Sequence, residues 1–282
     1  MERAEHVLRG CRSGWPLTKL VAAASAIAAR APKLAVLLTT GALNPVHRGH
    51  LDACRRARRC LEAEHGYSVA AGFLSVSHDS YVRTKVSGAQ HAKAPARLAL
   101  LEALIADEPD LAPWVTAASW ESSPGRRKWP DYPVVINSLR EHLDKHGLKH
   151  VTIFYCCGSD HARYIPSGFP RKRAVGLVVT ARSGAPIRAS EPSKLIFHVT
   201  EVNPAMEALS STKVREALQR VAARGARWEE ALAEVESACG SRFFALAQRL
   251  GVYGLTEPVT QPSRHSTRGA LAVALDPVLE SL

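Results

Sequence analysis

The sequence is poor in the features of membrane and secreted proteins. No apolar run approaches the roughly 18 residues that a membrane-spanning helix needs. The apolar stretch LVAAASAIAA, residues 20–29, is too short and rich in alanine, so we expect a helix packed on the body of the protein. We therefore expect no membrane partner.

Cysteine is also sparse, and its spacing excludes two further classes. The six cysteines contain no CxxC pair, and two of them, Cys156 and Cys157, are adjacent. Neither a zinc cluster nor a disulfide framework has this pattern, which is typical of a reducing compartment. We expect a cytoplasmic or nuclear protein. Organelle targeting by the arginine-rich residues 1–30 is an alternative, although Glu2 and Glu5 oppose it because transit peptides are poor in acids.

Acidic residues are outnumbered. The chain has 26 Asp and Glu against 37 Lys and Arg, a net charge of +11. Such an excess favours anionic partners: nucleic acid, an acidic membrane surface or small phosphorylated molecules. The basic residues are spread along the chain, and the densest run, Arg171–Arg173, is short. With no long basic arm and no aromatic–basic RNA signature, nucleic acid is a disfavoured partner.

Strand and helix patterns alternate along the 282 residues, without internal repeats. This alternation predicts an α/β protein with a Rossmann-like, doubly wound, mostly parallel sheet and helices on both faces. We expect a helical extension at residues 1–32, one domain at 33–255 and a tail at 256–282. Predicted strands cover residues 34–39, 67–76, 113–119, 150–157, 174–182 and 195–202. Predicted helices cover residues 47–64, 96–105 and 134–145, and others begin at residues 212, 228 and 242.

The turn after the first predicted strand, TGALNPVHRGH, is a candidate ligand site, because such sheets bind ligands beyond the carboxyl ends of their strands. It lacks the G-x-G-x-x-G fingerprint of dinucleotide sites. Gly41 lets a ligand approach the backbone. We expect Asn44 and Pro45 to start a helix whose free amides bind an anion. His47 and His50 share one helix face, and both can donate to phosphate.

These histidines have two other interpretations. A metal pair is one, but no acidic or cysteine third ligand lies nearby. Ordinary surface histidines are the other. A second helix start, SSTKVREAL at residues 210–218, favours the phosphate interpretation. Its Ser and Thr residues can cap the helix and leave amides free, while Lys213 and Arg215 add positive charge.

The two segments resemble, in this order, the signatures of a known superfamily. TGALNPVHRGH resembles the (T/H)xGH motif of nucleotidyltransferases, and its Asn-Pro pair resembles the eukaryotic nicotinamide mononucleotide adenylyltransferases. SSTKVREAL resembles their ISSTKIRRAL, and CGSD at residues 157–160 resembles a third signature. The resemblance spans about residues 34–254. It implies catalytic roles for His47, His50 and Arg215. It implies ATP binding by Gly41, Ala42, Leu43, His47, His50, Gly158, Asp160, Ser211, Thr212, Lys213 and Arg215.

The same resemblance implies a mononucleotide site. FLSVSHDSYVRTK resembles a segment that contacts the mononucleotide, and ASWESSPGRRKW resembles one whose Trp stacks on the nicotinamide ring. The shortened loop YIPSGFPRKR offers Phe169 as the one candidate for the family's second stacking Trp. The implied mononucleotide-binding residues are Asp79, Tyr81, Arg83, Lys85, Trp120 and Phe169.

The activity that the resemblance implies is adenylyl transfer from ATP to nicotinamide or nicotinate mononucleotide. The products are NAD, or its deamido form, and pyrophosphate. Mg²⁺ is the expected cofactor and would accompany ATP, so no metal ligands are expected from the chain. Two alternatives are left open: a nucleotidyltransferase of the same fold with another phosphorylated acceptor, and a non-catalytic nucleotide- or RNA-binding relative. Homo-oligomerisation is also left open.

Overall fold

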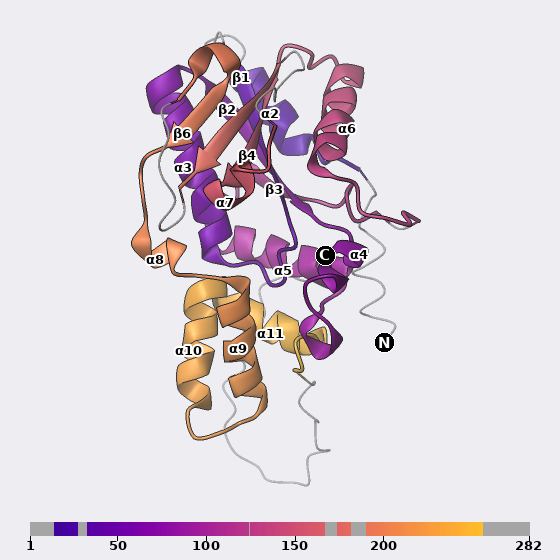
Figure 1. The fold of residues 1–282 in the computed structure, drawn as a ribbon, viewed down its shortest axis with the longest axis vertical. Coiled ribbons are helices and arrows are strands. Elements are labelled where there is room, and N and C mark those ends of the chain that lie inside the picture. The colour runs from indigo at the N-terminus through magenta and orange to yellow at the C-terminus, as the bar shows by residue number, and fades with distance from the viewer. Residues whose placement is uncertain (1–13, 28–32, 124, 167–173, 182–189, 256–282) are drawn as a thin grey trace, which may run out of the picture.

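The computed structural model describes residues 14–27, 33–123, 125–166, 174–181 and 190–255. At its centre is a six-stranded sheet in the order β3-β2-β1-β4-β5-β6, with every neighbouring pair parallel (Figure 1). This is the strand order of the doubly wound Rossmann fold, so the predicted fold class is confirmed. The strands are β1 (Leu34–Gly41), β2 (Ser68–Val76), β3 (Val115–Ala118), β4 (Thr152–Gly158), β5 (Val175–Thr180) and β6 (Ile196–Val199).

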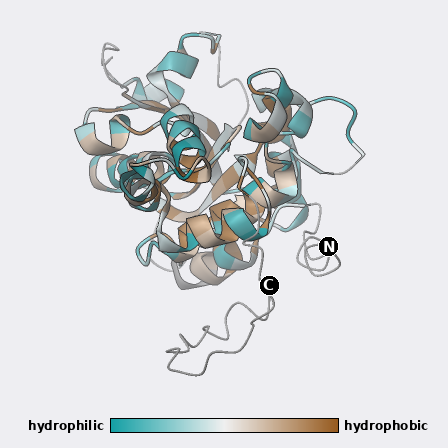
Figure 2. Ribbon diagram, turned by 90° about the horizontal axis from the view of Figure 1, so that it is seen from below, coloured by the Kyte–Doolittle hydropathy of each residue, from teal (hydrophilic) through white to brown (hydrophobic). Residues whose placement is uncertain are grey.

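Helices cover both faces of the sheet, because successive strand side chains point to opposite sides. In β1, Leu37 belongs to the core beneath α3 and α5, whereas Leu38 belongs to the core beneath α2 and α6. Apolar residues accordingly gather between the layers in Figure 2. The helix at the N-terminus packs on the body as expected, with Leu20 fully buried. These helices are α2 (Thr18–Ile27), α3 (Arg48–His65), α5 (Ala94–Ala106) and α6 (Tyr132–Lys145).

Three further helices form a group beside the sheet, seen at the bottom of Figure 1. In this group α10 packs on α9, and α11 packs on α10 and α5. The start of α9 thereby lies next to the turn that follows β1, as the bonds described below show. The three helices are α9 (Ser211–Ala222), α10 (Trp228–Cys239) and α11 (Ser241–Arg249).

The predicted elements all occur, with boundaries shifted by a few residues. One shift matters for the site: α3 begins at Arg48 with His47 as its N-cap. The expectation that Asn44 and Pro45 start this helix is therefore wrong, because they lie in the preceding turn. Three short helices lie where the sequence predicted no element: α4 (Asp79–Arg83), α7 (Ser159–Ala162) and α8 (Pro204–Glu207).

No helix among the described residues is long and apolar enough to cross a lipid bilayer. The predicted tail at residues 256–282 and the implied stacking residue Phe169 both lie outside the described residues.

Candidate functional site

An open pocket of about 620 Å³ lies at the carboxyl ends of the central strands. The ends of β1 and β4 both line it, and these are the neighbours at which the strand order reverses. Ligands of this sheet type bind at that point. The pocket brings together twelve of the predicted site residues: Gly41, Ala42, Leu43, His47, His50, Tyr81, Lys85, Gly158, Asp160, Ser211, Thr212 and Arg215.

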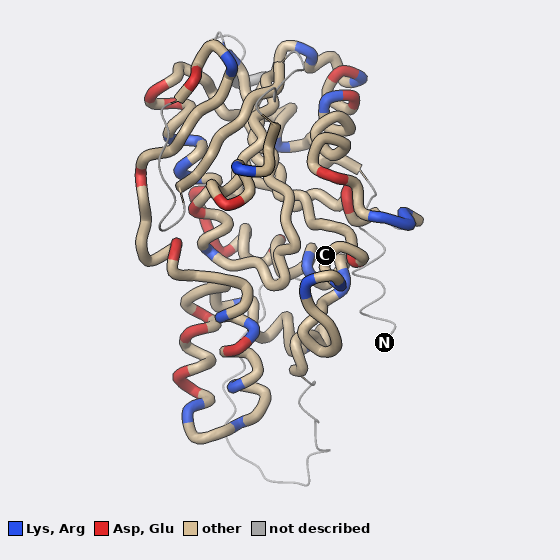
Figure 3. The backbone as a smooth tube through the Cα atoms, viewed as in Figure 1, with Lys and Arg blue, Asp and Glu red and all other residues tan. Residues whose placement is uncertain are grey.

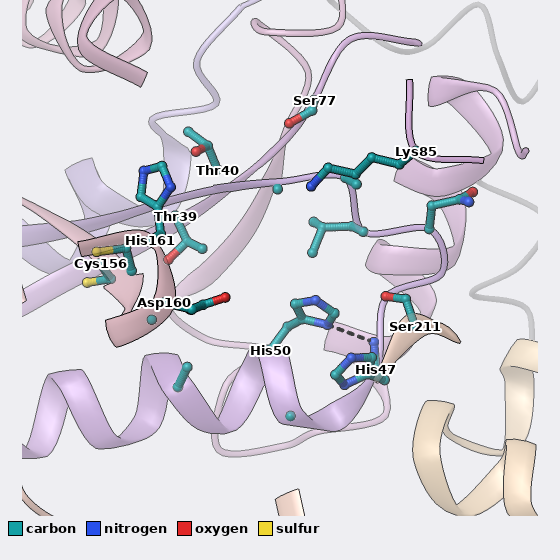
Figure 4. A pocket seen from close by; sticks show the side chains of 18 of the residues that line it. Thr39, Thr40, His47, His50, Ser77, Lys85, Cys156, Asp160, His161 and Ser211 are labelled. Atoms are coloured by element: carbon teal, nitrogen blue, oxygen red, sulfur yellow. Dashed lines mark hydrogen bonds between the residues drawn. The ribbon is translucent and has the colours of Figure 1, made fainter. Parts of the chain in front are cut away.

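His47 and His50 lie together at the N-terminus of α3, with their ring centroids 3.8 Å apart (Figure 4). The backbone N–H of His47 donates to Nδ1 of His50 over 3.2 Å. Because Nδ1 accepts this bond, a neutral His50 ring carries its proton on Nε2. The wall of the pocket thus contains an imidazole N–H donor beside the positive end of a helix, which is a site suited to an anion.

Gly49, between the two histidines, is required by close packing. A Cβ atom there would lie 2.7 Å from the carbonyl oxygen of Met206 in α8 and 3.0 Å from Nδ1 of His47. The absence of a side chain at position 49 therefore allows both α8 and the His47 ring to pack against the start of α3. Sequence reasoning did not single out this residue, although the motif contains it.

The start of α9 is bonded directly to the first turn. The Ser211 hydroxyl donates to the carbonyl oxygen of Pro45 over 2.8 Å. The Arg215 guanidinium donates to the carbonyl oxygen of Asn44 over 2.7 Å. The hydroxyl of Ser210 caps the helix by accepting from the backbone N–H of residue 213. Two segments far apart in sequence thus present two helix N-termini to one pocket.

One nitrogen of the Arg215 side chain makes no hydrogen bond within the described residues. This nitrogen, Nε, is buried. Burial also lowers the pKa of its guanidinium, because a charge removed from water is destabilised. An anion in the pocket would stabilise the charge of this guanidinium.

Arg97 holds the turn after β1 in place through hydrogen bonds. It is fully buried and donates to the carbonyl oxygens of Ala42 (2.6 Å) and Ser77 (2.7 Å), which follow β1 and β2. It also donates to the carboxylate of Asp79 over 2.7 Å. Asp79 does not line the pocket, so the structure places this predicted mononucleotide-binding residue as the partner of a buried arginine.

The two basic residues that follow Tyr81 differ in whether they line the pocket. Lys85 lines the pocket, with its Nζ 4.5 Å from the centre of the Tyr81 ring. Arg83 is exposed and is not among the lining residues. Lys213 likewise does not line the pocket, and its Nζ donates to the carbonyl oxygen of Ala208 over 2.8 Å.

Trp120 also does not line the pocket. Its ring is stacked on that of Trp15, a residue just before α2. The ring centroids are 6.0 Å apart and the angle between the ring planes is 15°. The guanidinium of Arg126 lies over it, 3.9 Å from the ring centre. Trp120 is therefore half-buried against side chains of the protein itself.

Glu121 lines the pocket and was missed by sequence reasoning. It is 3% exposed, and the hydroxyl of Ser75 donates to its Oε2 over 2.9 Å. Burial raises its pKa to about 7. An acid just beyond the end of a predicted strand, at the edge where ligands bind, was the signal that could have found it.

Carboxylates line the pocket, but no three of them lie close enough together to share one metal ion. These carboxylates are Glu121, Asp131, Asp160 and Glu207. Among the described residues, the one group of three side chains that could hold a metal is Cys60, Glu64 and His65, and it does not line this pocket.

Comparisons with known proteins identify a family and a shared fold. The family described as Cytidylyltransferase-like matches residues 38–217, a span that includes both helix starts. A search of curated proteins gives no match. The chain is similar to two structures of the nicotinic acid mononucleotide adenylyltransferase of Plasmodium falciparum. One, complexed with APC, has a TM-score of 0.55 and 10% identity, and the alignment covers 79% of this chain and 98% of that chain. The other, complexed with NaAD, has a TM-score of 0.53, 12% identity and the same coverage, 79% and 98%. At these identities the likeness shows the fold.

Proposed function

The chain belongs to the cytidylyltransferase-like family of nucleotidyltransferases, and from this premise we propose that it transfers the adenylyl group of ATP to a pyridine mononucleotide. The observation that carries the proposal is the joining of two helix N-termini at one pocket, with His47, His50 and Arg215 around them. The similar Plasmodium falciparum structures, whose titles name a nicotinic acid mononucleotide adenylyltransferase, support the choice of acceptor.

The proposed reaction needs no nucleophile from the protein. A phosphate oxygen of the mononucleotide attacks the α-phosphorus of ATP, and the bond from that phosphorus to the bridging oxygen of pyrophosphate breaks. Catalysis then consists of positioning and of stabilising the charge that grows on the leaving group. His50 would donate from Nε2 to phosphate oxygens, with His47 beside it. Arg215 and the amides after Ser211 would hold the terminal phosphates.

We propose that Mg²⁺ enters this site as a partner of ATP rather than as a resident ion. The donor set has no carboxylate cage, which suits an ion that keeps several of its waters and binds mainly to substrate phosphates. Bound in that way, it would neutralise phosphate charge. The exposed carboxylate of Asp160 would accept hydrogen bonds from its waters.

The experiment that tests this proposal offers purified protein ATP and Mg²⁺ with one acceptor at a time. The acceptors are nicotinamide mononucleotide, nicotinate mononucleotide and phosphopantetheine, and the product is identified by mass. We expect a dinucleotide with a pyridine mononucleotide, and the ratio of kcat/KM gives the preferred ring. If only phosphopantetheine gives a product, the proposed acceptor is wrong. If no acceptor gives a product although ATP binds measurably, the proposed transfer reaction is contradicted.

A further inference from the structure

Three side chains that are able to bind a metal ion meet at the end of α3 that is remote from the pocket. They are Cys60, Glu64 and His65. The Cys60 sulfur, a carboxylate oxygen of Glu64 and a ring nitrogen of His65 all lie within 4.8 Å of one another. None of the three residues lines the pocket. Cys60 follows His50 by ten positions in α3, a rise of about 15 Å, so this cluster is separate from the proposed phosphate site.

The geometry of the helix end brings these side chains together. Cys60 and Glu64 are four positions apart, so they share one face of α3. His65 is the last helical residue, and Gly66 ends the helix in the left-handed conformation with φ at 68°. The His65 ring stacks on that of Phe197 in the edge strand β6, with the ring centroids 3.9 Å apart and an angle of 26° between the planes. The imidazole is thereby held where α3 packs along β6 (Figure 1).

One ring nitrogen of His65 is buried without a partner. It is Nε2, which makes no hydrogen bond within the part of the chain that the structure describes. Buried polar atoms in this state are uncommon, and a bound ion is one arrangement that explains them. When the ring proton is on Nδ1, Nε2 has a free lone pair, as metal binding requires.

The exposed carboxylate of Glu64 acts on the thiol of Cys60. The neighbouring arginines pair with other acids: Arg58 with Glu62 over 3.0 Å, and Arg59 with Glu201 over 2.8 Å. Burial, and after it the charge of Glu64, raises the pKa of the Cys60 thiol to about 11. A divalent cation between the two groups would favour the thiolate, because its charge offsets that of the carboxylate.

We propose that Cys60, Glu64 and His65 bind one Zn²⁺ ion through sulfur, oxygen and nitrogen, with water as the fourth ligand. Zn²⁺ uses these three ligand types, whereas Mg²⁺ prefers oxygen ligands, so the ion that accompanies ATP does not compete for this site. The cysteine spacing excludes a cluster of several cysteines, and this site contains only one. The proposal does not depend on the proposed transfer reaction.

Binding requires a small movement and the loss of a proton. Zinc–ligand bonds of about 2.0–2.3 Å in a tetrahedron place the ligand atoms about 3.5 Å apart, so the three atoms approach one another by about 1 Å. The S–H bond of Cys60 breaks, a zinc–sulfur bond forms, and the proton passes to the solvent. Zinc affinity should therefore rise with pH.

Binding of Co²⁺, which replaces Zn²⁺ and is visible by absorption, tests the proposal on the full chain after treatment with a chelator. A thiolate ligand gives charge-transfer absorption in the near ultraviolet, and tetrahedral coordination gives intense visible bands. We expect both signals to saturate at one Co²⁺ per chain. Zn²⁺ should remove them, and Mg²⁺ should not.

Five variants locate the ion. Cys60→Ser should abolish the charge-transfer band, and Glu64→Gln and His65→Gln should each weaken zinc binding at least about 10-fold. Glu62→Gln is the matched control, because Glu62 is an acid of the same helix outside the cluster. Cys11→Ser is the control for the cysteine that lies outside the described residues. The melting temperature in the presence of chelator shows whether each variant is folded.

A missing charge-transfer band in wild-type protein, or a band that persists in Cys60→Ser, would overturn the proposal. Should Cys60→Ser fail to fold, unchanged zinc affinity in both Glu64→Gln and His65→Gln would overturn it. Metal binding without a sulfur signal would also contradict it and would point to a pair such as His142 and His146, whose ring centroids lie 4.5 Å apart. Absence of adenylyl transfer would leave this site unaffected.

Discussion

At the scale of single residues, His47 and His50 are the side chains on which the proposed reaction depends most. The bond from the His47 backbone to His50 Nδ1 fixes which nitrogen of a neutral His50 ring can donate to phosphate. We predict that His50→Ala lowers kcat about 10²- to 10³-fold, as loss of an oxyanion-type donor does. The acceptor KM should change much less. Steady-state kinetics checks this, with His150→Ala, an exposed residue outside the pocket, as the matched control. Near-normal turnover of His50→Ala would remove the role assigned to the turn.

Glu121 makes stability depend on pH. Burial raises its folded-state pKa to about 7 from 4.5, so between these values the folded state holds a proton that the unfolded state has lost. Stability contributed by the protonated carboxyl is therefore lost as pH rises from about 4.5 to 7, by an amount on the order of 3 kcal/mol. We expect Glu121→Gln to show a smaller fall of unfolding free energy over this window. Denaturant titrations at several pH values measure it, and parallel curves for the two proteins would contradict it.

Which residues line the pocket was only partly predictable. His47, His50 and Arg215 could be found because short motifs at strand and helix ends carry their own geometry. The placement of Trp120 could not be predicted, because its ring packs on Trp15, which is distant in sequence, and lies beneath Arg126 of the same loop. Asp79 looks like a ligand residue in sequence, but its partner is a buried arginine.

At the scale of elements, the contact between α3 and α8 depends on Gly49. Alanine there would gain about 1 kcal/mol of helix propensity. Its Cβ, however, would lie 2.7 Å from a backbone oxygen of α8, and such overpacking costs about 1–3 kcal/mol. We predict that Gly49→Ala destabilises the protein. Gly41→Ala is the control, because a Cβ at Gly41 would meet Leu43 at 3.5 Å, an ordinary contact distance. Equal unfolding midpoints for both variants would contradict the packing argument.

At the same scale, the six strands and the long helices could be predicted, whereas the three helices of about one turn could not. Strands such as β2 and helices such as α3 run for nine and eighteen residues, which is enough for a period to be recognised. Helices α4, α7 and α8 have five, four and four residues, about one turn each, so they show no period. Their positions follow from tertiary contacts, such as that of Met206 with Gly49.

At the scale of the whole molecule, the net charge of +11 would attract the substrates electrostatically if both are polyanions. Basic residues lie on α4 and in the projecting loop before α6, next to the residues that line the pocket (Figure 3). Salt screens attraction between exposed charges. We predict that raising KCl from about 50 to 500 mM raises the KM for ATP several-fold while kcat changes less. A salt-independent KM would mean that the charge excess plays no part in capturing substrate.

The doubly wound, parallel sheet could be anticipated because alternating strands and helices allow few right-handed arrangements. The acceptor cannot be read in the same way, since it depends on a few contacts in the pocket wall.

The central claim is that the reaction occurs at the α-phosphorus of ATP. The most direct measurement follows radioactive label from ATP into products in the presence of pyridine mononucleotide and Mg²⁺. Our account predicts that label in the α-phosphate appears in the dinucleotide and label in the γ-phosphate appears in pyrophosphate. Transfer of γ-label to the acceptor, or no transfer of either label, would contradict it.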